Sequence, residues 1–392
     1  MKRDFSLFKE CPDSRARAGE LVTGHGKVAT PAFLPVGSQA TVKTLTPEEI
    51  LGLGFDMVLS NAYHLYLRPG IPVIKELGGL HRFMGWDKAI LTDSGGYQIF
   101  SLATLSKITD EGVTFSSHID GSQHFITPEL AVEYQEALGA DIIMALDECP
   151  PSDAGPGRIK AAVERTSRWA ERCLKAKKND NQALYGIVQG GVSAELRQRS
   201  AESLCSLDFP GYAIGGLSLG ETKEVTMAMV EETTALLPSD KPRYLMGVGS
   251  PEDIVNAVAR GIDVFDSVLP TRLGRNGSLF TRQGRINITN AIYKQVERPV
   301  DSGCGCYSCL NFSAAYLNHL FRSRELLAYR LATIHNLYFI SDLMSKIRKA
   351  ILNGSFASFM ADFLGNYQST NEHTRREQKQ KWLKRNRSGE VT

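Results

Sequence analysis

Eight short apolar runs along the first 270 residues constrain the fold more than any other feature of this sequence. Each run ends in small or polar residues. Because the runs lack apolar–polar alternation, they indicate strands that are buried on both faces, as in a parallel sheet. The predicted strands are Ala32–Val36, Asp56–Asn61, Ala89–Ser94, Asp141–Glu148, Ala183–Gln189, Gly211–Leu217, Arg243–Gly249 and Asp263–Pro270.

Helix starts fall between these runs. Thr46, Thr127 and Ser250 are each followed by proline and then glutamate, which places a capping residue before a proline and an acid in the first helical turn. Residues 158–178 lack glycine and proline and indicate an outer helix. Strand and helix repeated eight times predict a (β/α)8 TIM barrel. A doubly wound open sheet is the alternative, but no G-x-G-x-x-G follows the first run.

Three of the seven cysteines, Cys304, Cys306 and Cys309, fall within six residues. The N-terminus lacks the apolar core of a secretion signal, so the cluster indicates metal ligands in preference to disulfides. Three thiolates at this spacing can surround one tetrahedral zinc ion, which requires a fourth ligand. Of two candidates, His335 is favoured over His319. Four protein ligands indicate a structural zinc, and a catalytic zinc with an open position is the alternative.

Two stretches interrupt the repeat, and together with the cysteines they suggest a division of the chain. Residues 104–125 predict a β excursion that contains an Asp-Gly hairpin signal, and residues 278–288 predict a second hairpin. Helices are expected over residues 311–330 and from His335 to about Asn353. We assign 1–275 to the barrel with an N-terminal β segment, 276–365 to a zinc-binding subdomain with closing helices, and 366–392 to a basic tail.

Charge is distributed unevenly along the chain, although its net value is only +2. Residues 268–392 carry 19 lysines and arginines against 8 acidic residues, whereas residues 1–267 carry 26 against 35. This asymmetry predicts a polyanion bound by the C-terminal third, and a basic tail without a specific partner is the alternative. No apolar run reaches the roughly 18 residues of a membrane span. The expected location is therefore cytoplasmic.

Three aspartates follow predicted strand ends, which is where barrel enzymes place their catalytic groups. Asp93, Asp147 and Asp266 come after the third, fourth and eighth runs or close them. Any one of them could cap a helix, but aspartate is rarely buried unless paired, so three at one mouth indicate a site. Two carboxylates across a pocket suit chemistry at an anomeric carbon, where one attacks and the other handles protons.

Other strand ends predict what that site binds. Gly215 and Gly216 have no side chain, so a flat ring could approach their backbone. Gln189 could read an amide edge as both donor and acceptor, and Tyr97 could stack on the ring. Arg272 follows Asp266 with no acid nearby. These residues together indicate a purine-like pocket beside an anionic backbone site.

Several motifs then point to a family. TDSGGYQ at 92–98, ALDEC at 145–149, VQGG at 188–191, IGGLSLGE at 214–221 and FDSVLPTR at 265–272 resemble the tRNA-guanine transglycosylases. The resemblance runs from about residue 5 to about residue 365 and includes the cysteine cluster. It implies a barrel with an inserted zinc subdomain, usually in a homodimer. It also implies exchange of the guanine at the first anticodon position of tRNA for a 7-deazaguanine base, in queuosine biosynthesis.

The resemblance implies a role for each matching residue. Asp266 matches the nucleophile that attacks the ribose C1′, Asp93 the proton-handling carboxylate, and Asp147 the acid on the Watson–Crick edge of the base. The remaining matches are the base pocket (Gln189, Gly215, Gly216), the residues that sandwich the base (Tyr97, Met246), the readers of the anticodon flanks (Arg272, Arg275) and the zinc ligands (Cys304, Cys306, Cys309, His335).

Two positions depart from the bacterial pattern. Ser267 replaces a cysteine, and Leu219 replaces a valine near the wall that accommodates the 7-substituent. Cys149 at that wall is retained, which favours 7-aminomethyl-7-deazaguanine as the incoming base.

Two other functions are alternatives. A non-catalytic tRNA-binding subunit would lack Asp266. A barrel glycosidase acting on free sugars would leave the cysteine cluster and the basic third unexplained.

Overall fold

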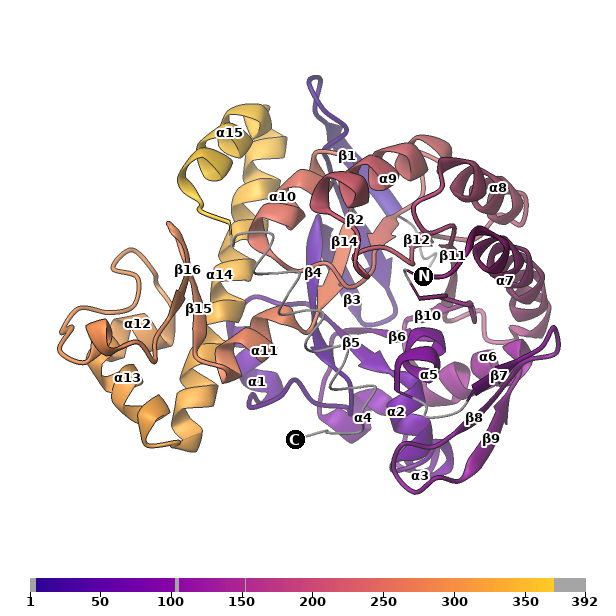
Figure 1. Cartoon of the computed structure of the whole chain (residues 1–392), viewed down its shortest axis with the longest axis horizontal. Helices are drawn as coiled ribbons and strands as arrows, with labels where there is room; N and C mark the ends of the chain where they lie inside the picture. Colours follow the sequence, from indigo (N-terminus) through magenta and orange to yellow (C-terminus); the bar gives the residue numbers. More distant parts are fainter. Residues whose placement is uncertain (1–4, 103–105, 152, 370–392) are drawn as a thin grey trace.

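The computed structural model describes residues 5–102, 106–151 and 153–369, and a closed parallel barrel of eight strands lies at its centre (Figure 1). Neighbouring strands follow the chain order, and β14 pairs back onto β4 to close the ring. The strands are β4 (Ala32–Gly37), β5 (Met57–Asn61), β6 (Ala89–Asp93), β10 (Ile142–Met144), β11 (Ala183–Val188), β12 (Tyr212–Ile214), β13 (Arg243–Leu245) and β14 (Val264–Ser267). The predicted TIM barrel is confirmed, and the open sheet is excluded.

One predicted strand, Asp141–Glu148, is longer than the β10 that forms. Beyond Met144 only the amide of Ala145 continues the ladder, by donating to the carbonyl of Tyr185 at 3.0 Å. The next donors turn to helix side chains instead: the amide of Glu148 bonds to Oγ1 of Thr166 at 3.0 Å. The chain therefore leaves the barrel wall before Asp147, and this acid stands on a loop above the strand.

Helices cover the outside of the barrel, and their starts use the predicted caps. Thr46 and Thr127 accept hydrogen bonds from the amides of Glu49 and Leu130, but the hydroxyl of Ser250 donates to Asp253 and makes no capping bond to the backbone. The helices are α1 (Pro47–Gly52), α2 (Ala62–Leu67), α3 (Ile71–Glu76), α4 (Leu80–Met84), α5 (Gly96–Leu102), α6 (Pro128–Leu138), α7 (Pro156–Ala176), α8 (Ala194–Cys205), α9 (Lys223–Leu236), α10 (Pro251–Val258) and α11 (Leu269–Arg275).

An N-terminal sheet closes one end of the barrel. It comprises β1 (Phe5–Glu10), β2 (Arg17–Thr23) and β3 (Gly26–Thr30), and Leu21 and Val28 pack on the apolar residues of the barrel interior. Arg17 forms a buried ion pair with Asp263, the residue before β14, with 2.5 Å between Nη2 and Oδ2. The N-terminal sheet therefore covers this end, and the open mouth lies at the other end, where the strands finish.

The excursion after β6 contains an antiparallel sheet of three strands, β7 (Ser106–Ile108), β8 (Val113–Ser116) and β9 (Gln123–Ile126). The turn between β7 and β8 is fixed to α7. Nε1 of Trp169 donates to the carbonyl of Asp110 at 2.8 Å, and Nε of Arg165 donates to its carboxylate at 3.1 Å. The excursion is thus attached to the barrel beside the loop that carries Asp147.

The C-terminal part packs beside the barrel on a long helix, α14 (Figure 1). The single helix predicted over 311–330 is wrong, because Arg324 adopts a positive φ of 57° that ends α13. His335 lies within α14 and not at the start of a helix. The elements are β15 (Ser278–Thr281), β16 (Gly284–Asn287), η1 (Ala291–Tyr293), α12 (Tyr307–Asn311), α13 (Ala314–Arg322), α14 (Leu326–Asn353) and α15 (Phe356–Asn366).

The division of the chain at residues 275 and 365 stays a prediction. Most of the predicted basic tail, residues 370–392, lies outside the described residues. Across the described residues, none of the helices combines the length and the apolar character that crossing a membrane requires.

Candidate active site and metal centre

The three predicted aspartates come together at the open end of the barrel. Asp93 closes β6, Asp266 lies near the end of β14, and Asp147 follows β10. Because the strands are parallel, their C-terminal ends form a single mouth. Asp93 and Asp147 are buried, and Asp266 is partly exposed. Asp93 is close enough to the other two carboxylates for their charges to raise its pKa.

The surroundings of Asp93 favour its protonated form. Its carboxyl accepts hydrogen bonds from the side-chain amide of Asn61 and from the backbone amide of Ala62, the latter at 3.2 Å. Burial, and then the charges of Asp266 and Asp147, outweigh these bonds and raise the pKa of Asp93 to about 8. Near neutral pH this group therefore holds a proton that it can donate.

Asp266 is held through one of its two oxygens. Oδ1 accepts a 2.6 Å hydrogen bond from the hydroxyl of Tyr244 and a 2.8 Å bond from the amide of Gly247. Burial raises the pKa of Asp266, and these two bonds oppose the shift. Within the described residues no hydrogen bond ends on Oδ2. A fixed carboxylate with one uncommitted oxygen is suited to nucleophilic attack.

Asp147 and Gln189 form a polar pair. Nε2 of Gln189 donates to Oδ2 of Asp147 at 2.7 Å, and the hydroxyl of Ser94 donates to Oδ1 at 3.4 Å. Burial raises the pKa of Asp147 to about 6 in spite of these bonds. Oε1 of Gln189 is buried without a hydrogen-bond partner among the described residues. A buried acceptor without a partner is costly, which fits a site that is completed by a donor on a ligand.

The glycine pair lies directly against this amide. A Cβ added to Gly215 would lie 2.7 Å from Nε2 of Gln189, and one added to Gly216 would lie 2.3 Å from Oε1. Gly216 also has a φ of +67°, which disfavours other residues. The floor of the site is therefore backbone and amide, which can bind the edge of a flat heterocycle.

The remaining predicted residues lie on segments that follow the barrel strands. Tyr97, on α5, is 37% exposed, and its pKa is raised by burial and by the neighbouring Cys149, with the nearby charge of Arg272 opposing the shift. Met246 follows β13 and packs partly against the barrel interior. Arg272 and Arg275 lie on α11, and burial lowers the pKa of both. Aromatic and cationic groups thus border the acidic pocket.

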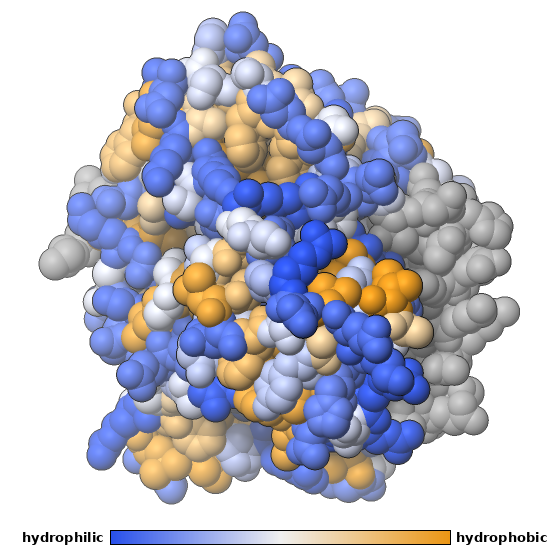
Figure 2. All heavy atoms as spheres, turned by 90° about the vertical axis from the view of Figure 1, so that its left-hand side faces the viewer, coloured by the Kyte–Doolittle hydropathy of each residue, from blue (hydrophilic) through white to orange (hydrophobic). Residues whose placement is uncertain are grey.

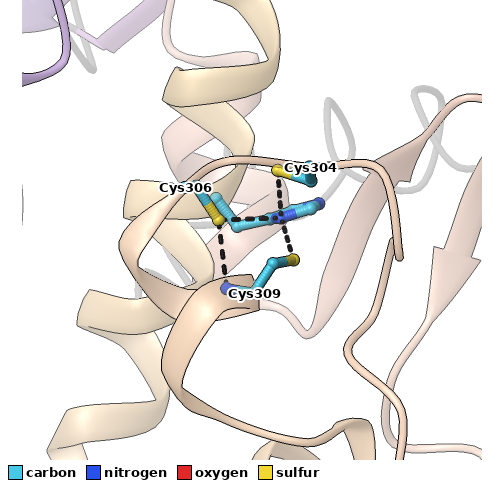
Figure 3. A group of neighbouring side chains, drawn as sticks. Cys304, Cys306 and Cys309 are labelled. Atoms are coloured by element: carbon cyan, nitrogen blue, oxygen red, sulfur yellow. Dashed lines mark hydrogen bonds between the residues drawn. The ribbon is translucent and has the colours of Figure 1, made fainter.

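A second group of ligand-type side chains lies in the C-terminal part (Figure 3). Nδ1 of His335 is 3.7, 3.5 and 3.3 Å from the sulfurs of Cys304, Cys306 and Cys309. Tetrahedral zinc with its usual bond lengths would hold such atoms about 3.6 Å apart, so the four residues fit that ion. Nε2 of His335 donates to the carbonyl of Phe280 at 2.6 Å, which leaves Nδ1 as the ligand atom.

This cluster decides between the two histidines of the sequence analysis, because His335 belongs to it and the exposed His319 does not. Protein side chains would therefore fill all four positions around a tetrahedral ion. The group can hold a metal ion, and it lies outside the acidic pocket.

Comparison with known sequences shows the family of the chain. The sequence model of the family described as queuine tRNA-ribosyltransferase matches residues 11–369. The chain belongs to this family. It is therefore a transferase, as the resemblance of its motifs implied.

Three relatives named queuine tRNA-ribosyltransferase illustrate the similarity. The chain is 60% identical to the protein of Dehalococcoides mccartyi over 392 residues, which cover all of both chains. The Herpetosiphon aurantiacus protein is 58% identical over 366 residues, or 93% of each chain. The Moorella thermoacetica protein is 54% identical over 365 residues, which cover 93% of this chain and 98% of the relative.

Sequence reasoning about this queuine tRNA-ribosyltransferase family member missed three contacts at the site. Asn61 bonds to Asp93, and Tyr244 bonds to Asp266. Arg197 lies beneath the glycine pair and donates to the carbonyl of Gly215. Asn61 could have been found, because it closes a predicted strand like the aspartates do. Tyr244 and Arg197 carried no signal, since one lies within an apolar run and the other within a helix.

Proposed function

We propose that this protein exchanges the guanine at the first anticodon position of tRNA for a 7-deazaguanine base through a covalent intermediate on Asp266, in queuosine biosynthesis. The observation that carries the proposal is the set of three aspartates at one barrel mouth, in which Asp93 is protonated near neutral pH and Asp266 keeps one oxygen uncommitted. Family membership supports the same reaction.

The chemistry follows from these two residues. Oδ2 of Asp266 attacks the ribose C1′, and the bond from C1′ to N9 of guanine breaks with its electron pair passing to the base. Asp93 donates its proton to the leaving guanine and later receives the proton of the incoming base. The ribosyl ester preserves the activated carbon while one base replaces the other. To enter the pocket, the base must leave the anticodon stack.

Recognition of the base is assigned to Asp147, Gln189 and the backbone of Gly215 and Gly216. Asp147 accepts from the donors of a guanine-type edge, and the uncommitted Oε1 of Gln189 accepts another. Tyr97 and Met246 sandwich the ring. A guanine-type base offers adjacent N–H donors that match these acceptors, whereas adenine does not.

The incoming base is proposed to be 7-aminomethyl-7-deazaguanine. Buried Cys149 supports this choice, since its pKa is raised to about 12 by burial and by Asp147, so it remains a neutral thiol in the wall. Because Leu219 replaces a valine near this wall, the size of its side chain bears on which 7-substituent fits. Competition between this base, queuine and guanine for wild-type enzyme measures the preference directly.

Arg272 and Arg275 are proposed to bind the anticodon flanks. Both belong to α11, which follows Asp266 directly, and Nη1 of Arg275 is buried without a hydrogen-bond partner among the described residues. Phosphate oxygens would complete such donors. Binding should therefore weaken as salt concentration rises.

The cysteine cluster is proposed to hold one structural zinc ion per chain, bound by Cys304, Cys306, Cys309 and His335. When bound, zinc would fix the loop between β16 and α13 onto α14. Thiolate ligands suit a reducing compartment, in keeping with the predicted cytoplasmic location.

A homodimer is proposed as the working form. Support comes from apolar side chains exposed in the C-terminal part, among them Ile292 at 72%, Leu310 at 71% and Leu326 at 79%. Figure 2 looks onto this side of the molecule and shows apolar surface among hydrophilic residues. Light scattering after size exclusion should give twice the mass of the 43.1 kDa chain.

Incorporation of labelled guanine into tRNA tests the proposed reaction. Wild-type enzyme should label tRNA with guanine at the first anticodon position and leave tRNA with adenine there unlabelled. Asp266→Asn should incorporate no label. Normal labelling by this variant would show that the nucleophile is another residue, and no labelling by wild type would remove the proposed function.

A further inference from the structure

Arg197 lies beneath the pocket and takes no part in the reaction steps proposed for Asp266 and Asp93. It is fully buried on α8. Its Nε donates to the carbonyl of Gly191 at 2.8 Å and its Nη2 donates to the carbonyl of Gly215 at 3.1 Å. These carbonyls belong to the loops after β11 and β12. A single side chain therefore connects the two loops that form the floor of the pocket.

The glycine turns are packed too tightly for this contact to be incidental. A Cβ on Gly190 would lie 2.7 Å from the amide nitrogen of Arg197 and 2.8 Å from its Cγ. The same helix also holds the floor through Ser200, whose hydroxyl accepts the amide of Gln189 at 3.1 Å. Helix α8 thus fixes the backbone of Gln189 and both glycine turns from behind.

The charge of Arg197 is not balanced by direct pairing. No carboxylate lies within ion-pair distance of it among the described residues, and Nη1 is buried without a partner. Burial lowers its pKa to about 10, which still leaves it cationic at neutral pH, and its ionisable neighbours are the carboxylate of Glu221 and the neutral thiol of Cys149. A buried cation under a low-dielectric pocket acts strongly on charge that develops there.

We propose that Arg197 is a positioning residue for base exchange: it holds the Gly191 and Gly215 peptides in place, and its charge stabilises the departing guanine. This inference rests on the proposed function. When the bond from C1′ to N9 breaks, the electron pair moves onto the base before the proton of Asp93 arrives. Negative charge therefore builds up above the floor that Arg197 supports.

Two substitutions separate the charge from the shape of this side chain. Arg197→Gln removes the charge, whereas Arg197→Lys retains it. Arg199→Gln is the matched control, because Arg199 lies exposed on the same helix and, within the described part of the chain, forms a surface ion pair with Glu164. The measurements are the single-turnover rate of covalent adduct formation with tRNA, the Kd for tRNA, and the melting temperature of each full-length variant.

Arg197→Gln should slow adduct formation by about tenfold or more, with an unchanged Kd for tRNA. Arg197→Lys should recover most of that loss, and Arg199→Gln should match wild type. Equal losses in the Gln and Lys variants, a wild-type rate in the Gln variant, or unfolding of both at the assay temperature would each overturn the inference. Absence of adduct with wild-type enzyme would instead count against the proposed function.

Discussion

The hydroxyl of Tyr244 donates a 2.6 Å hydrogen bond to Oδ1 of Asp266 across the end of the barrel. Together with the amide of Gly247, it fixes the carboxylate and opposes the rise in pKa that burial causes. The residue proposed to attack tRNA is therefore oriented by a strand neighbour whose side chain has no acid–base task of its own.

Tyr244→Phe should impair activity most at low pH. Without the hydroxyl, the pKa of Asp266 rises further, so the variant carries less ionised nucleophile than wild type does. This deficit is larger at pH 6 than at pH 8. A charge-assisted bond of about 1.5–3 kcal/mol corresponds to a loss of roughly tenfold to a hundredfold in rate. A pH profile of base exchange measures the shift.

Tyr185→Phe is the matched control for that substitution. Tyr185 is also buried on a barrel strand, but its acidic neighbour is Asp263, at the closed end. Its pH profile should coincide with that of wild type. A Tyr244→Phe profile without a displaced acidic limb would separate Tyr244 from the nucleophile.

The paired carboxyls predict a bell-shaped pH dependence. Activity needs Asp266 ionised and Asp93 protonated. It should fall above pH of about 8, where Asp93 loses its proton, and fall in acid at a pH above the usual aspartate range, because burial raises the pKa of Asp266. Asp266→Asn removes a negative neighbour, so the carboxyl carbon of Asp93 should titrate at lower pH by NMR. An unchanged titration would show that the two acids are not coupled.

Gln189→Met should weaken recognition of the free base. The substitution keeps the volume but removes both the donor to Asp147 and the uncommitted acceptor, so KM for the base should rise roughly fivefold to a hundredfold. The Kd for tRNA should change little. The control is Gln182→Met, since Gln182 is buried too but bonds the carbonyls of Gln135 and Ala140. It should lower stability and leave KM unaltered.

Removal of the metal should destabilise the protein without altering the pocket. Cys306→Ala, or treatment of wild type with a chelator, should lower the melting temperature and release about one zinc ion per chain, measured by atomic emission. If zinc saturates the site a thousandfold above its Kd, about 4 kcal/mol of stability depends on it. His319→Ala should retain the metal. Stable, active protein without zinc would contradict the assignment.

Much of this fold was predictable because its signals are local. A continuous apolar run that ends in a polar residue marks both a barrel strand and its catalytic end, so Asp93 and Asp266 were found together with their strands. Thr46 and Thr127 mark the starts of their helices by an equally local signal, a capping residue followed by proline and glutamate. The closed ring then brings together strand ends that are far apart in the sequence.

What the sequence did not reveal depends on contacts between distant segments. Arg17 and Asp263 are 246 positions apart, and neither residue type suggests a buried pair. The positive φ of Arg324, which lies between α13 and α14, has no glycine to mark it in the sequence. Tyr244 resembles any apolar strand residue until the carboxylate beside it is known.

If Asp266 carries the ribose during exchange, a covalent adduct between this residue and tRNA can be isolated. Enzyme incubated with tRNA and no free base is denatured, digested with nuclease and protease, and analysed by mass spectrometry. We expect one peptide that contains Asp266 and bears a ribose-linked mass. A ribosylated Asp93, or undiminished exchange with no protein–tRNA adduct, would contradict it.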